Sequence, residues 1–463
     1  MEPHILPLRD LVLGGEVLRQ LWQQAVTTLK SLQSPLGVTA SGPEDQFHAI
    51  FGRDSLWTVL LALEAGRLLQ TKKQDTEGIN TSSYLDWLHD LSASVLRGLA
   101  QLQGKTVNDF NEEQPGRILH EYWNPVPERM VATRWPVMVN GCYYGSFDAT
   151  FLYIITMSQV DAFFDDKALL DELWPNIDAA FQWMLDWSDI DQDGLVEYKR
   201  RNPEGIGLEN QVWKDSGESI QIRHHPVQHP IAWVEVQGYA WAAYSAYAEL
   251  AKKRQTLTLA LHTELQQRMD GLLTGLQRFW LDDEHCPAIA LDGNKQPIPV
   301  VASNAGHLLW STCLEQTRAW QLRERLLQPD ILTPWGLRTL SEKAYYYNPL
   351  VYHCGGIWPF DNAVVTLGLQ KYGFDADAHT IAESVLQAIL AFEKPVELYT
   401  VQPSRWIRSH RIEQEWFLAD YFYACSVQTW TAAAILYFTA MLINSSVRPL
   451  ASAMGIQASP FGA

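Results

Sequence analysis

Apolar residues recur every three or four positions along most of the chain. The segment 84–103 shows this spacing at Leu88, Leu91, Val95, Leu99 and Leu102, and the segment 259–280 repeats it. Such spacing places apolar side chains on one face of a helix. By the same criterion, about ten further helices are predicted over 16–33, 54–69, 147–166, 174–187, 232–252, 305–325, 361–371, 377–393, 411–424 and 428–444.

Several of these segments are apolar around much of their circumference, as in "AWVEVQGYAWAAYSAYAEL". Such helices are buried on more than one side. No convincing set of alternating strands accompanies them, so the pattern predicts an all-α fold. Long polar and aromatic loops follow every second helix, which indicates one domain of helical hairpins with its loops gathered on one face. These loops cover about 104–146, 188–231, 281–304, 328–360 and 394–410.

Charge and cysteine usage narrow the classes of partner. The chain has 463 residues and a formal net charge of -18, so nucleic acid and anionic membrane surfaces are poor partners. The longest apolar run, "TAAAILYFTAMLI", is short for a membrane span. The five cysteines show no metal-binding spacing, and the first residues do not resemble a secretory signal, so we expect a cytoplasmic protein. The oligomeric state is left open.

Aromatic residues are frequent, with 19 Trp, 18 Tyr and 16 Phe. Core packing accounts for many of them. An excess of Trp also suits carbohydrate binding, because the C–H faces of sugars pack on indole rings while their hydroxyl groups remain free for hydrogen bonds.

Two acids in long loops are candidates for catalysis. Asp215, in "NQVWKDSGES", is either a helix cap or a general acid, and apolar rings such as Trp213 would raise its pKa. Glu397, in "EKPVELYT", is either a surface acid or a general base.

Other motifs carry open alternatives. Asp54 follows Arg53 at the start of a predicted helix, so it either caps that helix or binds sugar hydroxyls. In "YNPLVYHCGGIWPFDNA", Asp361 fits a helix cap and His353 a core histidine. A Ser–His–Asp hydrolase is disfavoured because G-x-S-x-G is absent. No phosphate-binding or dinucleotide fingerprint occurs, so we expect no cofactor.

The stretch "WSDIDQDGLVEYKRR" resembles half of a calcium loop, with acids at Asp189, Asp191 and Asp193. Its twelfth position is Arg200, where an EF-hand needs a glutamate. We therefore favour a tight acidic turn over a calcium site, and we expect no metal.

Eleven strings, in order across about 36–440, resemble the bacterial glycogen-debranching-like, or amylo-alpha-1,6-glucosidase-like, family of six-hairpin glycosidases. They are "FGRDSLWT", "GRILHEYW", "YYGSFDATFLY", "WPNIDAAFQWM", "DQDGLVEY", "GLENQVWKDSGES", "PIAWVEVQGYAW", "SNAGHLLWS", "WGLRTLS", "YNPLVYHCGGIWPFDNA" and "ACSVQTW". The resemblance implies an (α/α)6 barrel over 36–445, with residues 1–35 as a lead-in helix that is part of the barrel and 446–463 as a tail.

The resemblance also implies inverting hydrolysis of an α-glucosidic bond by two carboxyl groups. Asp215 matches the family's general acid, and Glu397 is the candidate base, although "PVEL" is one residue longer than the family's usual sequence. The candidates for substrate binding lie in the matching strings, with Trp57, Trp123, Trp213 and Trp358 as stacking walls. The others are Arg53, Asp54, Glu121, Lys214, Glu235, Gln237, His353 and Asp361.

Three functions remain in competition for a carbohydrate substrate. The first is hydrolysis of a glycogen-derived oligosaccharide. The second is hydrolysis of a small glycoside such as glucosylglycerate or trehalose, which would suit a barrel preceded by only about 35 residues. The third is sugar binding without catalysis. Other α/α-barrel chemistries, such as polysaccharide elimination or isoprenoid cyclisation, are less favoured.

Overall fold

The computed structural model describes residues 13–71, 78–126, 137–223, 226–403 and 416–444. The predicted tail, 446–463, lies outside these ranges. The described chain is mostly helical, as the sequence predicts. Its α-helices are α1 (Gly15–Ser31), α2 (Gly52–Thr71), α3 (Thr81–Gln101), α5 (Ala149–Phe164), α6 (Lys167–Trp187), α7 (Val234–Lys253), α8 (Leu259–Leu276), α9 (His307–Ser311), α10 (Gln316–Leu326), α11 (Pro359–Lys371), α12 (Asp375–Phe392) and α13 (Thr429–Asn444).

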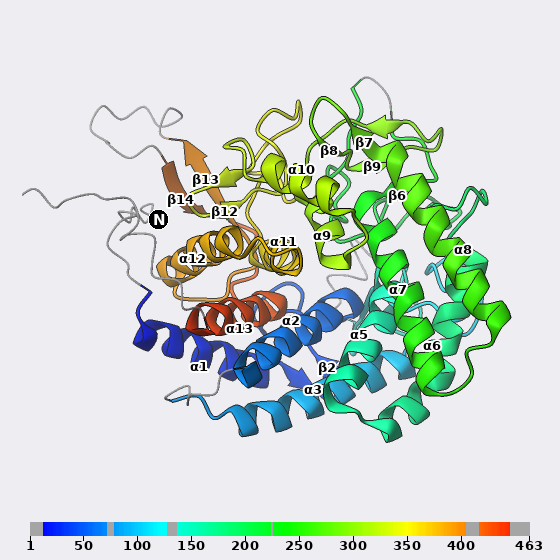
Figure 1. The fold of residues 1–463 in the computed structure, drawn as a ribbon, viewed down its shortest axis with the longest axis horizontal. Helices are drawn as coiled ribbons and strands as arrows, with labels where there is room; N and C mark the ends of the chain where they lie inside the picture. The colour runs from blue at the N-terminus through cyan, green and yellow to red at the C-terminus, as the bar shows by residue number, and fades with distance from the viewer. Residues whose placement is uncertain (1–12, 72–77, 127–136, 224–225, 404–415, 445–463) are drawn as a thin grey trace, which may run out of the picture.

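Six helices contact one another in a closed sequence. Along it, α2 packs on α5, α5 on α7, α7 on α9, α9 on α11, α11 on α13, and α13 on α2 again. The helices α6, α8 and α1 each pack outside one member, and α3 and α12 each pack against two (Figure 1). Helix α10 packs on the 3-10 turn η2 (Ser303–Gly306) that leads into α9. Inner members such as α5 and α13 are buried along most of their length, which is why their sequences are apolar on all sides.

Two predicted helices differ from the structure. The predicted helix over 305–325 is divided into η2, α9 and α10, because Thr312 adopts a left-handed backbone conformation with φ of 60° and ends α9. The predicted helix over 411–424 is wrong where the structure describes it. Trp416–Asp420 forms strand β14, which pairs antiparallel with β13 (Tyr399–Pro403). The cross-strand hydrogen bonds of this hairpin outweigh the local helical pattern.

Short strands lie in the connections between helices. The sheet β3-β4-β5 joins Ile50–Phe51, Glu121–Tyr122 and Cys142–Tyr143, and β10-β9-β6 joins Pro297–Ile298, Ala290–Leu291 and Ala232–Trp233. Because β3 runs directly into α2 and β6 directly into α7, these sheets fix the N-terminal ends of inner helices. The remaining two-stranded pairs are β1-β2 (Gln33–Ser34, Gly37–Val38), β7-β8 (Trp280–Leu281, Cys286–Pro287) and β11-β12 (Leu332–Thr333, Gly336–Leu337).

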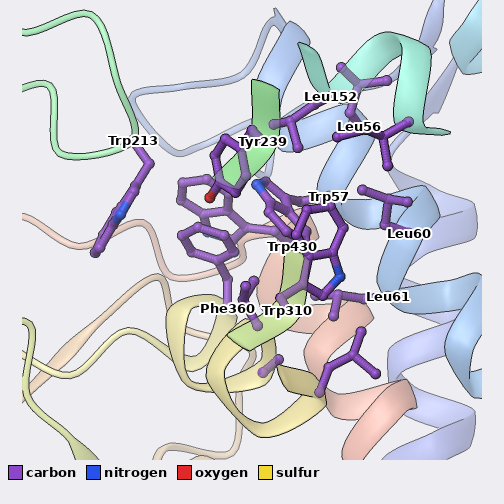
Figure 2. Close-up of a cluster of buried hydrophobic side chains, with 14 of the residues drawn as sticks. Leu56, Trp57, Leu60, Leu61, Leu152, Trp213, Tyr239, Trp310, Phe360 and Trp430 are labelled. Atoms are coloured by element: carbon purple, nitrogen blue, oxygen red, sulfur yellow. The ribbon is translucent and has the colours of Figure 1, made fainter. Parts of the chain in front are cut away.

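An aromatic cluster fills the centre of the ring (Figure 2). The indole of Trp57, on α2, lies 4.7 Å from that of Trp310 on α9, measured between ring centroids. Phe360 of α11 stacks on Trp430 of α13 at 4.0 Å. These contacts join helices that are distant in sequence. None of the helices in the described ranges is long and apolar enough to span a lipid bilayer.

Candidate active site

The candidate residues gather where the inner helices begin. Arg53 and Asp54 start α2, and Asp361 lies in the first turn of α11. Glu235 stands in the first turn of α7, and His307 starts α9. Hydrogen bonds join neighbouring helices at this end, so these residues, from segments far apart in the sequence, gather in two adjoining side-chain networks.

Arg53 connects two carboxylates. One guanidinium nitrogen contacts both oxygens of Asp148 at 3.1 and 3.0 Å, and the other donates to Asp215 Oδ2 at 2.8 Å. Asp148 precedes α5, is fully buried, and also accepts a hydrogen bond from the Ser146 hydroxyl at 2.7 Å. Asp148 and Ser146 therefore hold Arg53 in a fixed position beside Asp215.

Asp215 remains partly accessible, with 22% of its side chain exposed. Removal from water raises the pKa of its carboxyl to about 6, although the positive charge of Arg53 opposes that rise. His120 Nε2 lies 3.9 Å from Asp215 Oδ2. Because burial and the charge of Arg53 lower the pKa of His120 well below its usual value, this ring stays neutral near pH 7.

Two further carboxyl groups belong to the same electrostatic cluster. Burial raises the pKa of Asp54 to about 7 and that of Glu121 to about 8, and the charge of Asp215 contributes to both rises. Gln428, just before α13, donates to Asp54 Oδ1 at 3.0 Å, and Trp123 Nε1 donates to Glu121 Oε2 at 2.7 Å. The site therefore concentrates carboxyl groups that retain protons near neutral pH.

Glu397 is the second candidate for catalysis, and its carboxyl is held at both oxygens. The Tyr352 hydroxyl donates to Oε1, and the Cys425 backbone N–H donates to Oε2 at 2.9 Å. Burial raises the pKa of Glu397 to about 8, the two hydrogen bonds oppose this rise, and the charge of Asp54 adds to it. Glu397 thus lies within electrostatic range of the cluster around Asp215.

Aromatic rings form a wall beside these acids. Trp358 stacks on His353 with centroids 5.1 Å apart, and Trp213 meets both rings edge-on. The Ser216 hydroxyl and His353 Nδ1 lie 2.9 Å apart, which ties this wall to the residue after Asp215. The wall is therefore fixed relative to the candidate acid.

A second buried network lies next to Trp213. Lys214 points away from Asp215, and its ammonium donates to the Thr339 carbonyl at 2.5 Å. Burial lowers the pKa of Lys214 and raises that of Glu235. His307 joins Asp361 at 2.8 Å and Tyr239 at 2.5 Å. These groups are fully buried, so their contacts hold Trp213 and the helix ends in place.

Two further predicted binding residues, Trp57 and Gln237, also have contacts that are typical of structural roles. Trp57 is fully buried in the aromatic cluster between α2 and α9 (Figure 2). Gln237 is fully buried and locks a loop to α7, because its amide group exchanges hydrogen bonds with the backbone of Val196 and donates to the Trp233 carbonyl.

The residues that the sequence analysis missed include His120, Asp148, His307, Tyr352 and Gln428. His120 and Asp148 lie in the strings "GRILHEYW" and "YYGSFDATFLY". An acid at the start of a predicted helix, as at Asp148, was the one available signal. Local sequence does not reveal that its partner is Arg53, 95 positions earlier.

The acidic turn at 189–194 forms the tight turn favoured from the sequence. Asp189 accepts from the backbone N–H groups of Asp193 and Gly194, each at 3.1 Å. Asp189, Asp191 and Glu197 bring carboxylate oxygens close enough to hold a metal ion. The ammonium of Lys295 contacts Asp191, Asp193 and Glu197, so a cationic side chain offsets part of the negative charge of this cluster.

Comparisons with known proteins identify the family. Residues 124–400 match the model of the mannosylglycerate hydrolase MGH1-like glycoside hydrolase domain, a range that includes both Asp215 and Glu397. A search of curated proteins returned no match.

Solved structures share the fold. The GH63 mannosylglycerate hydrolase of Thermus thermophilus, in complex with Tris and D-glycerate, aligns with a TM-score of 0.63 and 14% identity, over 90% of this chain and 100% of that one. A glycosidase variant in complex with glucose aligns with a TM-score of 0.54 and 13% identity, over 93% and 98%. A rhamnosidase from Klebsiella oxytoca aligns with a TM-score of 0.54 and 13% identity, over 91% of this chain and 63% of that one.

The fold is that of the six-hairpin glycosidases, and the family model covers more than half of the chain. The protein is a glycoside hydrolase that belongs to the mannosylglycerate hydrolase MGH1-like family.

Proposed function

We propose that this protein hydrolyses a small α-glycoside with inversion, on an (α/α)6 barrel that extends over about 36–445 and includes α1 (Gly15–Ser31) as its lead-in helix. Asp215 protonates the leaving oxygen, and Glu397 takes a proton from the water that attacks the anomeric carbon. The observation that carries the proposal is the placement of these two carboxyl groups. They come from separate segments into one electrostatic cluster, because the charge of Asp215 acts on Asp54 and that of Asp54 acts on Glu397. Each has a raised pKa and its own positioning partner.

The raised pKa of Asp215 suits its role as the acid, and the hydrogen bonds to Glu397 suit its role as the base. A general acid must carry a proton near the working pH, and burial supplies this for Asp215. A general base must be aimed at the water, and two hydrogen bonds fix the carboxylate of Glu397. The partly exposed carboxyl of Asp215 can reach a substrate. Trp213 and Trp358 are each only 1% exposed, so they support the site from behind instead of offering the stacking walls expected from the sequence.

A small glycoside is favoured over a glycogen-derived oligosaccharide. The matching family is described by a mannosylglycerate hydrolase, and the T. thermophilus enzyme was solved with D-glycerate. We therefore expect hydrolysis of mannosylglycerate, glucosylglycerate or a disaccharide of comparable size, and much slower hydrolysis of limit dextrin. Parallel assays with these substrates, isomaltose and trehalose, would measure the preference. Faster release of glucose from limit dextrin would instead support the debranching activity implied by the resemblance.

The roles of the two acids are tested by Asp215→Asn and Glu397→Gln. Each change removes a proton-transfer group, so kcat should fall at least about 100-fold while circular dichroism stays unchanged. Asp282→Asn, at an exposed loop acid, is the control. Near-full activity of Asp215→Asn would exclude its role as the acid.

The stereochemical outcome is tested separately by proton NMR at early times. Hydrolysis of an α-glycoside by inversion releases the β-anomer of the sugar first. Initial release of the α-anomer would show a retaining mechanism and remove the assignment of Glu397 as a base.

A further inference from the structure

An aromatic segment lies between strand β14 and helix α13. It consists of Tyr421, Phe422 and Tyr423, in the sequence "DYFYACS". Phe422 and Tyr423 are exposed over 68% and 65% of their surface, and their ring centroids lie 4.1 Å apart. Two adjacent, exposed rings form an apolar surface of the kind that binds a partner or a ligand.

The aromatic segment is continuous with the candidate active site. Tyr421 is nearly buried, and its ring lies 5.4 Å from Phe422 on one side and 5.9 Å from Tyr352 on the other. The Tyr352 hydroxyl donates to Glu397. A row of rings therefore leads from the candidate base to the two exposed side chains.

The backbone of this segment is firmly held. Gln46 donates to the Tyr423 carbonyl at 3.0 Å, and Asp45 accepts from the N–H groups of Ser426 and Val427 at 2.8 and 3.1 Å. The next residue inward, Cys425, donates its N–H to Glu397. The two exposed rings are thus presented at a fixed position relative to the acid that they adjoin.

We propose that Phe422 and Tyr423 bind a second sugar ring of the glycoside, outside the ring that is hydrolysed. This inference rests on the proposed function and narrows its substrate class. The C–H face of a neutral hexopyranose packs on aromatic rings, whereas an open-chain group such as glycerate has no comparable face. The segment therefore adds affinity for disaccharides that it cannot add for a monosaccharide.

The test measures binding without turnover. In an Asp215→Asn background, calorimetric titration with isomaltose, trehalose and mannobiose is compared with titration with glucose and mannose. Removing both rings by Phe422→Ala and Tyr423→Ala should weaken binding of the preferred disaccharide about tenfold, which corresponds to about 1.4 kcal/mol, because both stacking surfaces are lost. Binding of the monosaccharides should stay the same.

Trp320→Ala is the matched control. Trp320 is also an exposed aromatic residue, at 52%, but it lies on α10 and not beside strand β14. This variant should bind all five sugars as the background does. Light scattering gives the molecular mass of each variant and so reports any association between copies of the chain.

Several outcomes would overturn the inference. The first is disaccharide affinity that is unchanged in the double variant. The second is an equal loss for monosaccharides, which would mean that the rings act through the hydrolysed-sugar site. The third is a change in molecular mass, which would assign the rings to a contact between copies of the chain. A background protein that binds no disaccharide more tightly than its monosaccharide would also overturn it. Because binding needs no turnover, these outcomes are separate from failure of the hydrolysis assay.

Discussion

Asp215 and Glu397 illustrate how two carboxyl groups obtain different properties from similar burial. Burial raises the pKa of both. The cationic partner of Asp215, Arg53, keeps that pKa near 6, whereas Glu397 has the neutral partners Tyr352 and Cys425 and a pKa near 8. The candidate base thus holds its proton more tightly than the candidate acid.

This order has a consequence for the pH profile. The competent form has Asp215 protonated and Glu397 ionised, so between about pH 6 and 8 it is a minor form whose population is nearly constant. We expect kcat/KM to show a bell-shaped profile with limbs near these two values. An optimum below pH 5 would contradict this arrangement.

Tyr352→Phe offers a sharper test. The Tyr352 hydroxyl lowers the pKa of Glu397, so its removal should raise that pKa. The alkaline limb should then move to higher pH, and the plateau should fall by the same factor, about tenfold for each pH unit. Measurement of kcat/KM from pH 5 to 10 for both proteins checks this. A lower plateau with an unmoved alkaline limb would indicate a structural role for Tyr352.

Sequence reasoning located the candidate acids but not the groups that position them. Asp215 and Glu397 stand in long loops next to apolar residues, a local signal. Tyr352 and Asp148 act on residues 45 and 95 positions away, so only the folded chain brings each pair together. Gln237 shows the converse, because a buried amide in an apolar helix suggests a site, while its partners are backbone groups of a neighbouring loop.

At the scale of elements, a close approach of backbones determines where a helix can sit. Gly98, on α3, faces the β1-β2 turn, and an added Cβ would lie 2.1 Å from the Leu36 carbonyl oxygen. Gly98→Ala should therefore lower the free energy of unfolding by about 1–3 kcal/mol, since the turn must move away. Denaturant titration would measure this.

Gly271, within α8, is the matched control. An added Cβ there meets no atom within 4 Å. Gly271→Ala should raise stability by up to about 1 kcal/mol through its effect on helix propensity. Equal effects of the two substitutions would show that the contact at Leu36 is not the cause.

Elements with a local sequence pattern could be predicted, and elements that depend on distant contacts could not. Outer helices such as α3 and α8 carry one apolar stripe, so their periodicity identified them. The hairpin β13-β14 and the break at Thr312 depend on pairing and backbone conformation, which local periodicity does not encode. Closure of the ring depends on contacts between α2 and α13 at opposite ends of the described chain.

At the scale of the whole molecule, the buried carboxyl groups of the site make the free energy of unfolding fall as the pH rises. The pKa of Glu121 is raised from 4.5 to about 8, so between these values the folded protein holds a proton that the unfolded chain has released. The unfolding free energy therefore falls as the pH rises through this window. Asp54 and Glu397 act in the same direction.

Glu121→Gln should remove this contribution. We expect the variant to have a melting temperature roughly 2 °C above that of the wild type at pH 8, and a much smaller difference at pH 5. Differential scanning calorimetry at both values checks the result. Glu44→Gln, at an exposed position, controls for the loss of one negative charge. A variant that is equally stabilised at both pH values would contradict the assigned titration.

The contact between α2 and α13 also bears on how the protein is made. The almost fully buried α2 ends at Thr71, and its partner α13 begins at Thr429. At about 5–20 residues per second, a ribosome needs roughly 20–70 s to synthesise the chain between them. During that time α2 cannot complete its packing, and its apolar surface stays available to chaperones or to other nascent chains. The demand for chaperones should therefore rise with the number of chains that are being synthesised at once, even though the finished ring is closed.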